Sequence, residues 1–371
     1  MLIALTGPPC SGKATIAHYL TTFHGFQPLL LAATAHHAPK FTSQLRQPLT
    51  FPTAEALTAH VTQHWNRDFV LVAIGDVRDW EVISKRPFAM LVGVDAPMSV
   101  RYRRVCEKIK NRTHKEEEED GYPSEMTLAE FVEADEKILF GSGYGSDLPS
   151  ISAMTLENST PTSPPTSSAA STSSTDPPPT LHTLLPHATL LLFNPYPTLP
   201  LLHEHLRLTH LTNPQRLRPG WDMYFMALCD LAARRSNCMK RRVGCILVKN
   251  NRIIATGYNG TPRGVTNCAE GGCPRCNKSG AGCGVGLDVC LCLHAEENAL
   301  LEAGRERIDD GRTILYCNTC PCLGCAKKII QVGVKEVVYA QAYGMDGMTE
   351  RLLTEAGVVL RQWVGVGGGG V

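Results

Sequence analysis

The sequence predicts an α/β protein of two domains. Near the N-terminus, an apolar segment at residues 2–5 leads into a glycine-rich loop and then into a helix candidate that extends to residue 20. Residues 218–364 show strand candidates alternating with helix candidates, and this alternation predicts a sheet covered on both faces. The chain of 371 residues is long enough for two such domains and a linker.

The first domain is predicted to span residues 1–211. Residues 150–180 are rich in Ser, Thr, Pro and Ala, a composition that cannot bury enough apolar surface to offset the entropy lost on ordering. We therefore predict a disordered insertion near the end of this domain. Apolar runs and helical spacing predict further buried strands at 69–74 and 88–94, a strand at 189–193 and a helix at 199–211.

The loop after the first strand, GPPCSGK, matches the GxxxxGK pattern of a phosphate-binding loop. In such a loop the backbone N–H groups between Gly7 and Gly12 bind phosphates, and Lys13 reaches the outer ones. Ala14 replaces the Ser or Thr whose hydroxyl would hold Mg²⁺, and Thr15 comes one residue late. The domain resembles the P-loop nucleotide kinases, which implies a three-layer fold. The departure at Ala14 favours a structural or nucleotide-sensing remnant over an active kinase.

The second domain is predicted to span residues 218–364, followed by a flexible glycine-rich tail at 365–371. A cysteine-rich insertion separates its first strands from the remaining elements. Apolar spacing predicts a helix at 221–236, strands at 243–249 and 252–258, a helix at 294–303, a strand at 313–317, a helix at 322–332, a strand at 336–340, a helix at 348–356 and a strand at 358–362.

The most informative motif pairs His294-Ala295-Glu296 with Pro321-Cys322-Leu323-Gly324-Cys325. This H-x-E…P-C-x-x-C pattern is typical of zinc-dependent nucleobase deaminases. The His294 imidazole and the thiolates of Cys322 and Cys325 would fill three positions of a tetrahedral zinc, leaving the fourth open to water. Glu296 would move protons without binding the metal. A purely structural zinc site is the alternative interpretation, and it would not need Glu296.

Composition narrows the classes of function and location. The formal net charge is +1, so no strong basic field favours long nucleic acids as partners. No apolar run reaches the length of a membrane-spanning helix, about 18 residues, and the apolar N-terminus is too short for a secretory signal. Thirteen of the 15 cysteines lie between Cys229 and Cys325. This density, without a signal sequence, favours reduced metal ligands over disulfides, so we expect a cytoplasmic or nuclear protein.

Five stretches of the second domain show a family resemblance. They are RSNCMKRRVGC (235–245), RIIATGYNGTPRG (252–264), GGCPRCN (271–277), LCLHAEENALLEAGR (291–305) and TCPCLGCAKKI (319–329). On these motifs, residues 221–363 resemble the fungal deoxycytidylate (dCMP) deaminases of the cytidine deaminase superfamily. The resemblance implies an α/β/α sandwich around a mixed five-stranded sheet. It also implies hydrolysis of dCMP to dUMP and ammonia, supplying dUMP for thymidylate synthesis, with Glu296 as the proton carrier.

The resemblance further implies a second, structural zinc. Three cysteines stand where related phage-type enzymes carry ligands, and the CPRC knuckle supplies a fourth. The implied ligands are Cys238, Cys268, Cys276 and Cys292. Cys283 and Cys290 remain alternatives for the fourth position, and thiols that merely pack as small apolar groups are the alternative to a metal site. The sequence thus predicts two zinc ions per chain.

Further expectations concern nucleotide binding. By resemblance, Asn259 in the GYNG loop holds the deoxyribose, although an Asn before Gly260 is also common in tight turns. The family implies a homohexamer that dCTP with Mg²⁺ activates and dTTP inhibits. Phosphate contacts and a solvated basic face are both open interpretations of the basic residues Lys240, Arg241, Arg242 and Arg263.

Two other classes of function remain as alternatives. A polynucleotide deaminase acting on cytidine or adenosine in RNA or DNA would need an exposed basic channel and a means of extruding the base. A non-catalytic zinc scaffold with a nucleotide-sensing loop would not need Glu296. The near-neutral charge and the GYNGTPRG segment favour a mononucleotide substrate.

Overall fold

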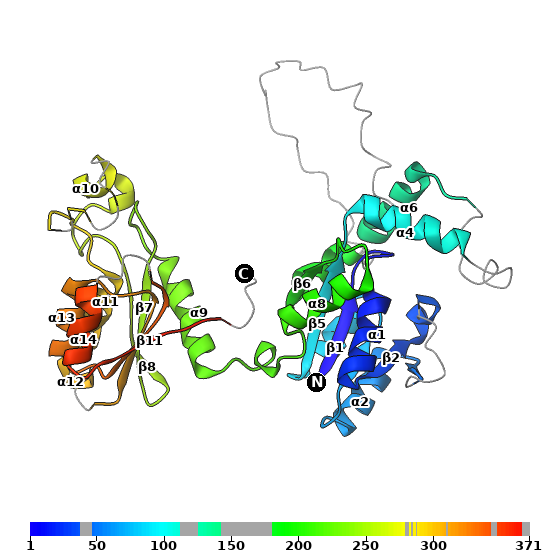
Figure 1. The fold of residues 1–371 in the computed structure, drawn as a ribbon, viewed down its shortest axis with the longest axis horizontal. Helices are drawn as coiled ribbons and strands as arrows, with labels where there is room; N and C mark the ends of the chain where they lie inside the picture. Colours follow the sequence, from blue (N-terminus) through cyan, green and yellow to red (C-terminus); the bar gives the residue numbers. More distant parts are fainter. Residues whose placement is uncertain are drawn as a thin grey trace, which may run out of the picture. The chain divides into compact units, whose positions relative to one another are not determined.

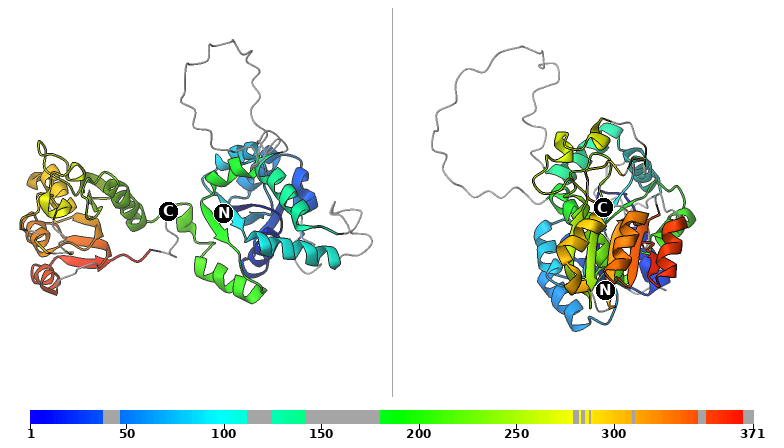
Figure 2. Two further views of the ribbon diagram at one scale, coloured as in Figure 1. Left: turned by 90° about the horizontal axis from the view of Figure 1, so that it is seen from above. Right: turned by 90° about the vertical axis from the view of Figure 1, so that its left-hand side faces the viewer.

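The computed structural model contains two compact units, Met1–Leu217 and Arg218–Val371, which are described separately (Figures 1 and 2). Among the described helices, none is long and apolar enough to cross a membrane. The predicted disordered insertion lies outside the described residues apart from Thr180, and the predicted tail lies outside them apart from Gly365. The structure describes residues 1–37, 47–111, 125–141, 180–278, 282, 285–286, 288–308, 311–342 and 347–365.

The first unit is built on a parallel sheet of six strands in the order β3-β2-β4-β1-β5-β6. β1 lies inside this sheet, where Ile3 pairs with Val70 of β4 and Met90 of β5. The glycine-rich loop therefore begins at the carboxyl end of an interior strand. The strands are β1 (Leu2–Thr6), β2 (Gln27–Leu31), β3 (Leu49–Phe51), β4 (Phe69–Leu71), β5 (Ala89–Asp95) and β6 (Leu190–Phe193).

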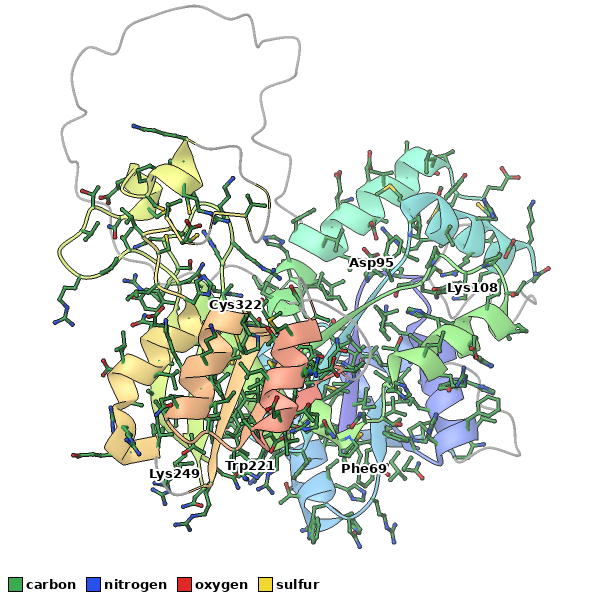
Figure 3. The ribbon with its side chains drawn as sticks, turned by 60° about the vertical axis from the view of Figure 1, so that its left-hand side comes forward. Phe69, Asp95, Lys108, Trp221, Lys249 and Cys322 are labelled. Carbon is green, nitrogen blue, oxygen red and sulfur yellow. The ribbon has the colours of Figure 1, made fainter. Side chains whose placement is uncertain are left out.

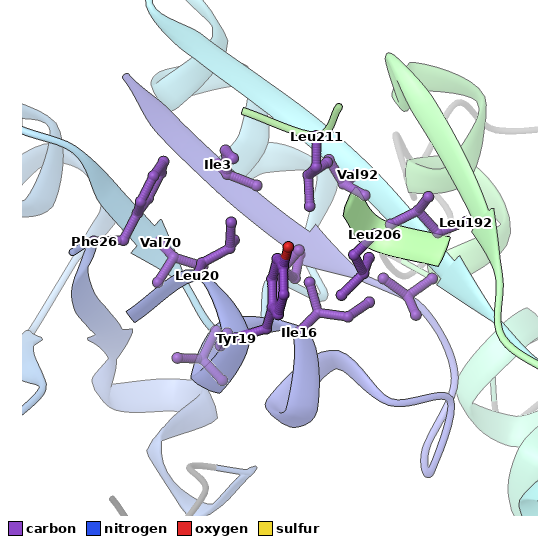
Figure 4. Packing of buried hydrophobic residues seen from close by; sticks show 14 of the residues in the cluster. Ile3, Ile16, Tyr19, Leu20, Phe26, Val70, Val92, Leu192, Leu206 and Leu211 are labelled. Carbon is purple, nitrogen blue, oxygen red and sulfur yellow. The ribbon is translucent and has the colours of Figure 1, made fainter. Parts of the chain in front are cut away.

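Helices cover both faces of this sheet, because alternate residues of a strand point to opposite faces. Ile3 shares a buried cluster with Leu20 of α1 and Leu206 of α8 (Figure 4), whereas Leu2 shares one with Leu57 of α2. The result is three layers. The helices are α1 (Lys13–His24), α2 (Ala54–Gln63), α3 (Val77–Ser84), α4 (Met98–Lys110), α6 (Leu128–Phe140), α7 (Leu181–Leu184) and α8 (Leu199–Thr209), with 3-10 turns at Ala32–His37, Leu185–His187 and Pro214–Arg216.

The second unit contains a mixed sheet of five strands in the order β11-β10-β9-β7-β8, which confirms the predicted sheet. β7 pairs antiparallel with β8 and β9, whereas β9, β10 and β11 run parallel. The ends of β9 and β10 therefore meet at one edge, where the Cys320 N–H donates to the Gln341 carbonyl (2.9 Å). The strands are β7 (Gly244–Lys249), β8 (Arg252–Tyr258), β9 (Thr313–Thr319), β10 (Glu336–Gln341) and β11 (Val359–Gln362).

Helices also cover both faces of the second sheet. Cys245 and Leu247 of β7 belong to the buried cluster that includes α11 and α13, whereas Ile246 and Val248 belong to the cluster under α9. Figure 1 shows α9 on one face and α11, α13 and α14 on the other. The helices are α9 (Trp221–Ala233), α10 (Pro274–Asn277), α11 (Ala295–Ala303), α12 (Arg305–Ile308), α13 (Leu323–Gln331) and α14 (Gly347–Glu355), with a 3-10 turn at Cys268–Glu270.

Two elements end three residues earlier than predicted, and α8 ends two residues earlier, at Thr209. α9 ends at Ala233 and not at residue 236, because Ser236 leaves the helix and donates its hydroxyl to the Asn259 carbonyl (2.8 Å). β4 ends at Leu71, since the Ile74 N–H beyond it donates to the Leu5 carbonyl (3.0 Å) outside the regular ladder.

Glycine at residue 257 allows α11 to lie directly on β8. A Cβ atom there would lie 2.1 Å from the Ala295 carbonyl oxygen and 2.5 Å from the Ala299 backbone nitrogen. Both neighbours are backbone atoms of a buried helix, so neither can move aside without shifting the helix. Gly257 thus sets how closely the first turn of α11 approaches the sheet.

We expect Gly257→Ala to lower the free energy of unfolding by about 1–3 kcal/mol, because the added methyl group overpacks the contact between β8 and α11. Chemical denaturation of the full chain measures the change. Gly347→Ala is the matched control, since a Cβ at Gly347 meets no atom within 4 Å and Gly347 begins α14. Equal stability of the two variants would contradict the close contact.

Candidate active site

His294 and Cys322 cap the N-termini of two neighbouring helices. His294 precedes α11 and Cys322 precedes α13, and both have extended backbone, with ψ of 155° and 167°. Figure 3 marks Cys322 at the start of α13. The positive end of a helix dipole favours a thiolate at such a position.

Hydrogen bonds fix the segment before α11 against the end of β8. Gly260 and Leu293 exchange backbone hydrogen bonds of 2.8 and 3.2 Å. One turn into α11, the Asn298 amide donates to the Tyr258 carbonyl (3.0 Å). The helix start is therefore held at both ends of its first turn.

Three ligand atoms converge between these helix ends. The His294 Nδ1 lies 3.3 Å from the Cys322 Sγ and 3.4 Å from the Cys325 Sγ, and all three atoms lie within 4.8 Å of one another. A tetrahedral zinc with ordinary Zn–N and Zn–S bond lengths separates nitrogen from sulfur by roughly 3.6 Å. The three residues therefore fit a zinc ion and leave one coordination position for a small molecule.

Glu296 lies beside these ligands but outside their group. It occupies the first turn of α11, is 4% exposed and lines the same cavity as His294 and Cys322. Burial raises the pKa of the Glu296 carboxyl to about 7. A carboxyl group in this position can hold or release a proton at the cavity wall.

Two cysteines on the cavity wall differ in charge. The pKa of Cys322 is lowered to about 3, mainly by its hydrogen bond with the Cys325 thiol and then by its bond with the His294 imidazole. Burial instead raises the pKa of Cys320 to about 12. Cys322 thus provides the thiolate that a metal ion needs, whereas Cys320 stays a neutral thiol.

A cavity of about 890 Å³ opens in front of these groups. Of the four basic residues singled out in the sequence, Lys240 and Arg241 line it, while Arg242 and Arg263 are not among its described lining residues. The lining comprises Cys238, Lys240, Arg241, Val243, Asn259, Arg275, Gly282, Cys290, Cys292, His294, Ala295, Glu296, Thr319, Cys320, Cys322 and Gln341. The cavity lining thus combines metal ligands and the acidic Glu296 with basic residues.

Asn259 lines the cavity while its amide supports the chain around it. Its Oδ1 accepts hydrogen bonds from the Val243 N–H (2.8 Å) and from the Ser236 hydroxyl (2.7 Å), whose single proton is shared with the Asn259 carbonyl. Its Nδ2 donates to the Arg241 carbonyl (2.7 Å). These bonds use both acceptor positions of the amide and one of its two N–H groups. Asn259 therefore fixes the segment 236–243, and what it can offer a ligand is the second N–H.

The cysteine-rich segment forms two overlapping groups of four thiols. Cys238, Cys268, Cys276 and Cys292 form the first, which is the group implied by the sequence. Cys273, Cys276, Cys290 and Cys292 form the second. Within each group, all sulfur atoms lie within 4.8 Å of one another. Cys283, an alternative fourth ligand in the sequence, lies outside the described residues.

The glycine-rich loop of the first unit lies between β1 and α1. Gly7 and Gly12 have φ of 137° and 111°, and a Cβ at Gly7 would lie 2.0 Å from the Val94 carbonyl oxygen. Lys13 donates to the carbonyls of Gly7 (2.6 Å) and Pro8 (2.7 Å), and burial lowers its pKa to about 8. A cavity of about 730 Å³ adjoins the loop, lined by residues that include Lys13, Arg104 and Lys108.

Sequence reasoning missed three residues in or behind the wall of this cavity: Arg275 and Gln341 line it, and Ser236 contacts the lining residue Asn259. Ser236 and Gln341 act through partners: Ser236 bonds Asn259, and the Gln341 Oε1 accepts from Arg241 (2.7 Å). Arg275 lines the wall beside the thiols. Only Arg275 had a local signal, because it lies inside the CPRC knuckle; the partners of Gln341 and Ser236 are set by the tertiary fold.

Comparison with known proteins identifies the family. Residues 219–341 match the family model of the cytidine and deoxycytidylate deaminase zinc-binding region. The deoxycytidylate deaminase of Schizosaccharomyces pombe is 43% identical over 362 residues, which cover 98% of this chain and 97% of that protein. The chain belongs to the deoxycytidylate deaminase family. Zinc is the metal expected in this family, and the His294, Cys322 and Cys325 ligand atoms fit it.

Two further relatives match part of the chain. The deoxycytidylate deaminase of Saccharomyces cerevisiae is 61% identical over 147 residues, 40% of this chain and 46% of that protein. The deoxycytidylate deaminase of Mycobacterium phage D29 is 43% identical over 127 residues, 33% of this chain and 95% of that protein. The phage member of the family thus corresponds to only a third of the present chain.

We expect Cys322→Ser to lose one zinc per chain, because a serine hydroxyl replaces the thiolate and leaves two strong ligands. Elemental analysis of the purified full chain measures the loss. Cys320→Ser is the matched control: Cys320 lines the same cavity but lies outside the ligand group, so this variant should keep its full zinc content. A full zinc content in Cys322→Ser would rule out this ligand set.

Proposed function

We propose that this chain catalyses the hydrolytic deamination of dCMP to dUMP and ammonia. The observation that supports it most directly is the buried Glu296 beside a three-ligand zinc site on the wall of a cavity, in a member of the deoxycytidylate deaminase family. A structural zinc site has no use for a buried carboxyl group at this place, since burying an ionisable group costs stability.

The proposed chemistry assigns each proton to Glu296. When bound at His294, Cys322 and Cys325, zinc lowers the pKa of a water molecule so that it can act as a nucleophile near neutral pH. The Glu296 carboxylate accepts one proton from the attacking water and delivers it to N3 of the cytosine ring. It would then take the second proton from the hydroxyl group now on C4 and transfer it to the exocyclic nitrogen, as the C4–N bond breaks, the C4 carbonyl forms and ammonia leaves. Glu296 returns to its starting state at the end of the cycle.

The basic residues in the cavity lining support the proposal that the substrate is a mononucleotide. We propose that Lys240 and Arg241 bind the 5′-phosphate, with Arg241 oriented by Gln341. The second N–H of the Asn259 amide is the proposed donor to the sugar. Two basic residues in the cavity lining are sufficient to bind a single phosphate group. An RNA or DNA strand would need an extended basic surface, and the net charge of this chain is only +1.

The proposed oligomer and its regulation rest on the family resemblance alone. We propose a homo-oligomer, a hexamer by resemblance, that dCTP with Mg²⁺ activates and dTTP inhibits. We also propose a reducing location, the cytoplasm or the nucleus. The location is supported by the fourteen described cysteines, all of which are free thiols.

For the first unit we propose a P-loop kinase-like domain that binds a nucleotide without transferring phosphate. The loop geometry and the basic residues on its cavity support anion binding. Ala14 supplies no hydroxyl for Mg²⁺. Lys13 bonds to its own loop, so a phosphate would have to displace those two hydrogen bonds.

Glu296→Gln should lower dCMP turnover by about 10²–10⁴-fold, the usual contribution of a positioned acid–base group, while zinc content stays unchanged. Ammonia release and elemental analysis on one preparation measure both. Glu297→Gln is the matched control, because Glu297 instead pairs with Lys328 (2.5 Å) outside the cavity lining. Substantial activity in Glu296→Gln, or loss of its zinc, would refute the proton-transfer role.

Lys13→Ala should leave dCMP turnover nearly unchanged, because the proposed catalytic and zinc-binding residues all lie beyond residue 235. We expect no phosphoryl transfer from ATP to any nucleoside or coenzyme precursor, in wild type or variant. Calorimetric titration with ATP should show binding that weakens in Lys13→Ala. Kinase turnover that disappears in this variant would show instead that the protein is bifunctional.

A further inference from the structure

Six thiols gather in the cysteine-rich segment next to the cavity. The two groups of four described above share two members, Cys276 and Cys292. Each group also has two thiols of its own: Cys238 and Cys268 in the first, Cys273 and Cys290 in the second. Together they form one buried cluster.

The spacing of these sulfur atoms suits metal ions and not disulfides. The Cys238–Cys276, Cys273–Cys290 and Cys276–Cys290 sulfur pairs are 4.0, 3.9 and 3.8 Å apart. Two thiolates on one tetrahedral zinc lie roughly 3.8 Å apart for Zn–S bonds of ordinary length. A disulfide would need about 2.05 Å. Each group therefore has the size of a single-ion site.

We propose that the segment holds a binuclear zinc–thiolate cluster in which Cys276 and Cys292 bridge two ions. One ion is bound by the bridging pair with Cys238 and Cys268, and the other by the bridging pair with Cys273 and Cys290. A single zinc would use one group and leave two buried or half-buried thiols of the other without a metal. Two ions with two shared ligands use all six.

Hydrogen bonds to sulfur support the assignment, since N–H donors commonly stabilise metal-bound thiolates. The Met239 N–H donates to the Cys268 sulfur and the Leu291 N–H to the Cys273 sulfur, both at 3.4 Å. Cys268 and Cys273 belong to different groups, and both are 0% exposed. Each proposed ion thus has one non-bridging cysteine ligand whose sulfur accepts a hydrogen bond from a backbone N–H.

The charge of the surroundings also suits two ions. Six thiolates and two divalent cations carry a net charge of two minus, which needs a nearby cation when buried. Arg275 lies between Cys273 and Cys276 in the chain and is 9% exposed. Its guanidinium donates to the Val285 carbonyl at 2.7 and 3.0 Å, which fixes its position beside the thiols.

The proposed cluster would form part of the active-site wall. Cys238, Cys290 and Cys292 line the cavity that also contains His294 and Glu296. Cys292 lies two residues before His294. Leu293, between them, forms backbone hydrogen bonds with Gly260. A bridging Cys292 would therefore fix the chain that leads directly into the proposed catalytic ligands.

Zinc counting of the full wild-type chain is the first test. We expect three ions per chain, one at His294 and two in the cluster, whereas a single-ion segment gives two. Cys290→Ser should lower the count by one, because Cys290 binds only the second ion and the first ion keeps its four ligands. Cys106→Ser, in the first unit and outside both groups, should keep three. Two ions in wild type, or an unchanged count in Cys290→Ser, would overturn the proposal.

Substitution of zinc by ¹¹³Cd provides a second test, which reads the bridged cluster in the wild-type chain. Two bridged ions should give two cadmium resonances in the all-sulfur region of the spectrum that are split by coupling to each other through the shared thiolates. A third, uncoupled resonance should disappear in Cys322→Ser. One all-sulfur resonance, or two without mutual coupling, would overturn the bridged cluster irrespective of whether the chain deaminates dCMP.

Discussion

The contact between β8 and the first turn of α11 is the constraint on which the deaminase unit depends. Gly257 permits backbone atoms of the helix to lie where a Cβ would otherwise be. The hydrogen bonds from Gly260 and Asn298 then fix the helix start along the strand. Since His294 and Glu296 occupy this helix start, one strand position without a side chain determines where the reactive groups face the cavity.

Local chemistry made much of the site predictable from sequence. The H-A-E and P-C-x-x-C motifs lie at helix starts. Both the spacing of the ligands and the helix-capping residue are set within a few residues of sequence, so these positions can be recognised without knowing the fold. The mixed sheet followed from the family resemblance, whereas apolar spacing predicted its individual strands. The predicted end of helix α9 was too late, because Ser236 forms a hydrogen bond with Asn259, which is distant in the chain and which the local sequence does not reveal.

The parts that could not be predicted depend on partners brought together by the fold. The sequence indicated that Asn259 binds a ligand or forms a turn. In the structure, its amide mainly forms hydrogen bonds that fix the segment 236–243. Arg241 is oriented by Gln341, 100 positions away in the chain. Likewise, spacing alone could not assign Cys290 to a group of metal ligands. Two groups of thiols overlap, and the sequence does not show which cysteines belong to both.

The same arrangement at Asn259 affects chemical ageing of the protein. In an Asn-Gly sequence, the glycine nitrogen attacks the side-chain carbonyl carbon, and the amide is lost through a cyclic imide. Here the attacking Gly260 nitrogen donates to the Leu293 carbonyl (3.2 Å), and the Asn259 amide is 7% exposed with bonds at both its oxygen and its nitrogen. In the folded state, hydrogen bonds therefore engage both the nucleophile and the side-chain amide that it would attack. Protection against this slow covalent damage lasts only while the loop stays folded, so each local opening event allows it to proceed.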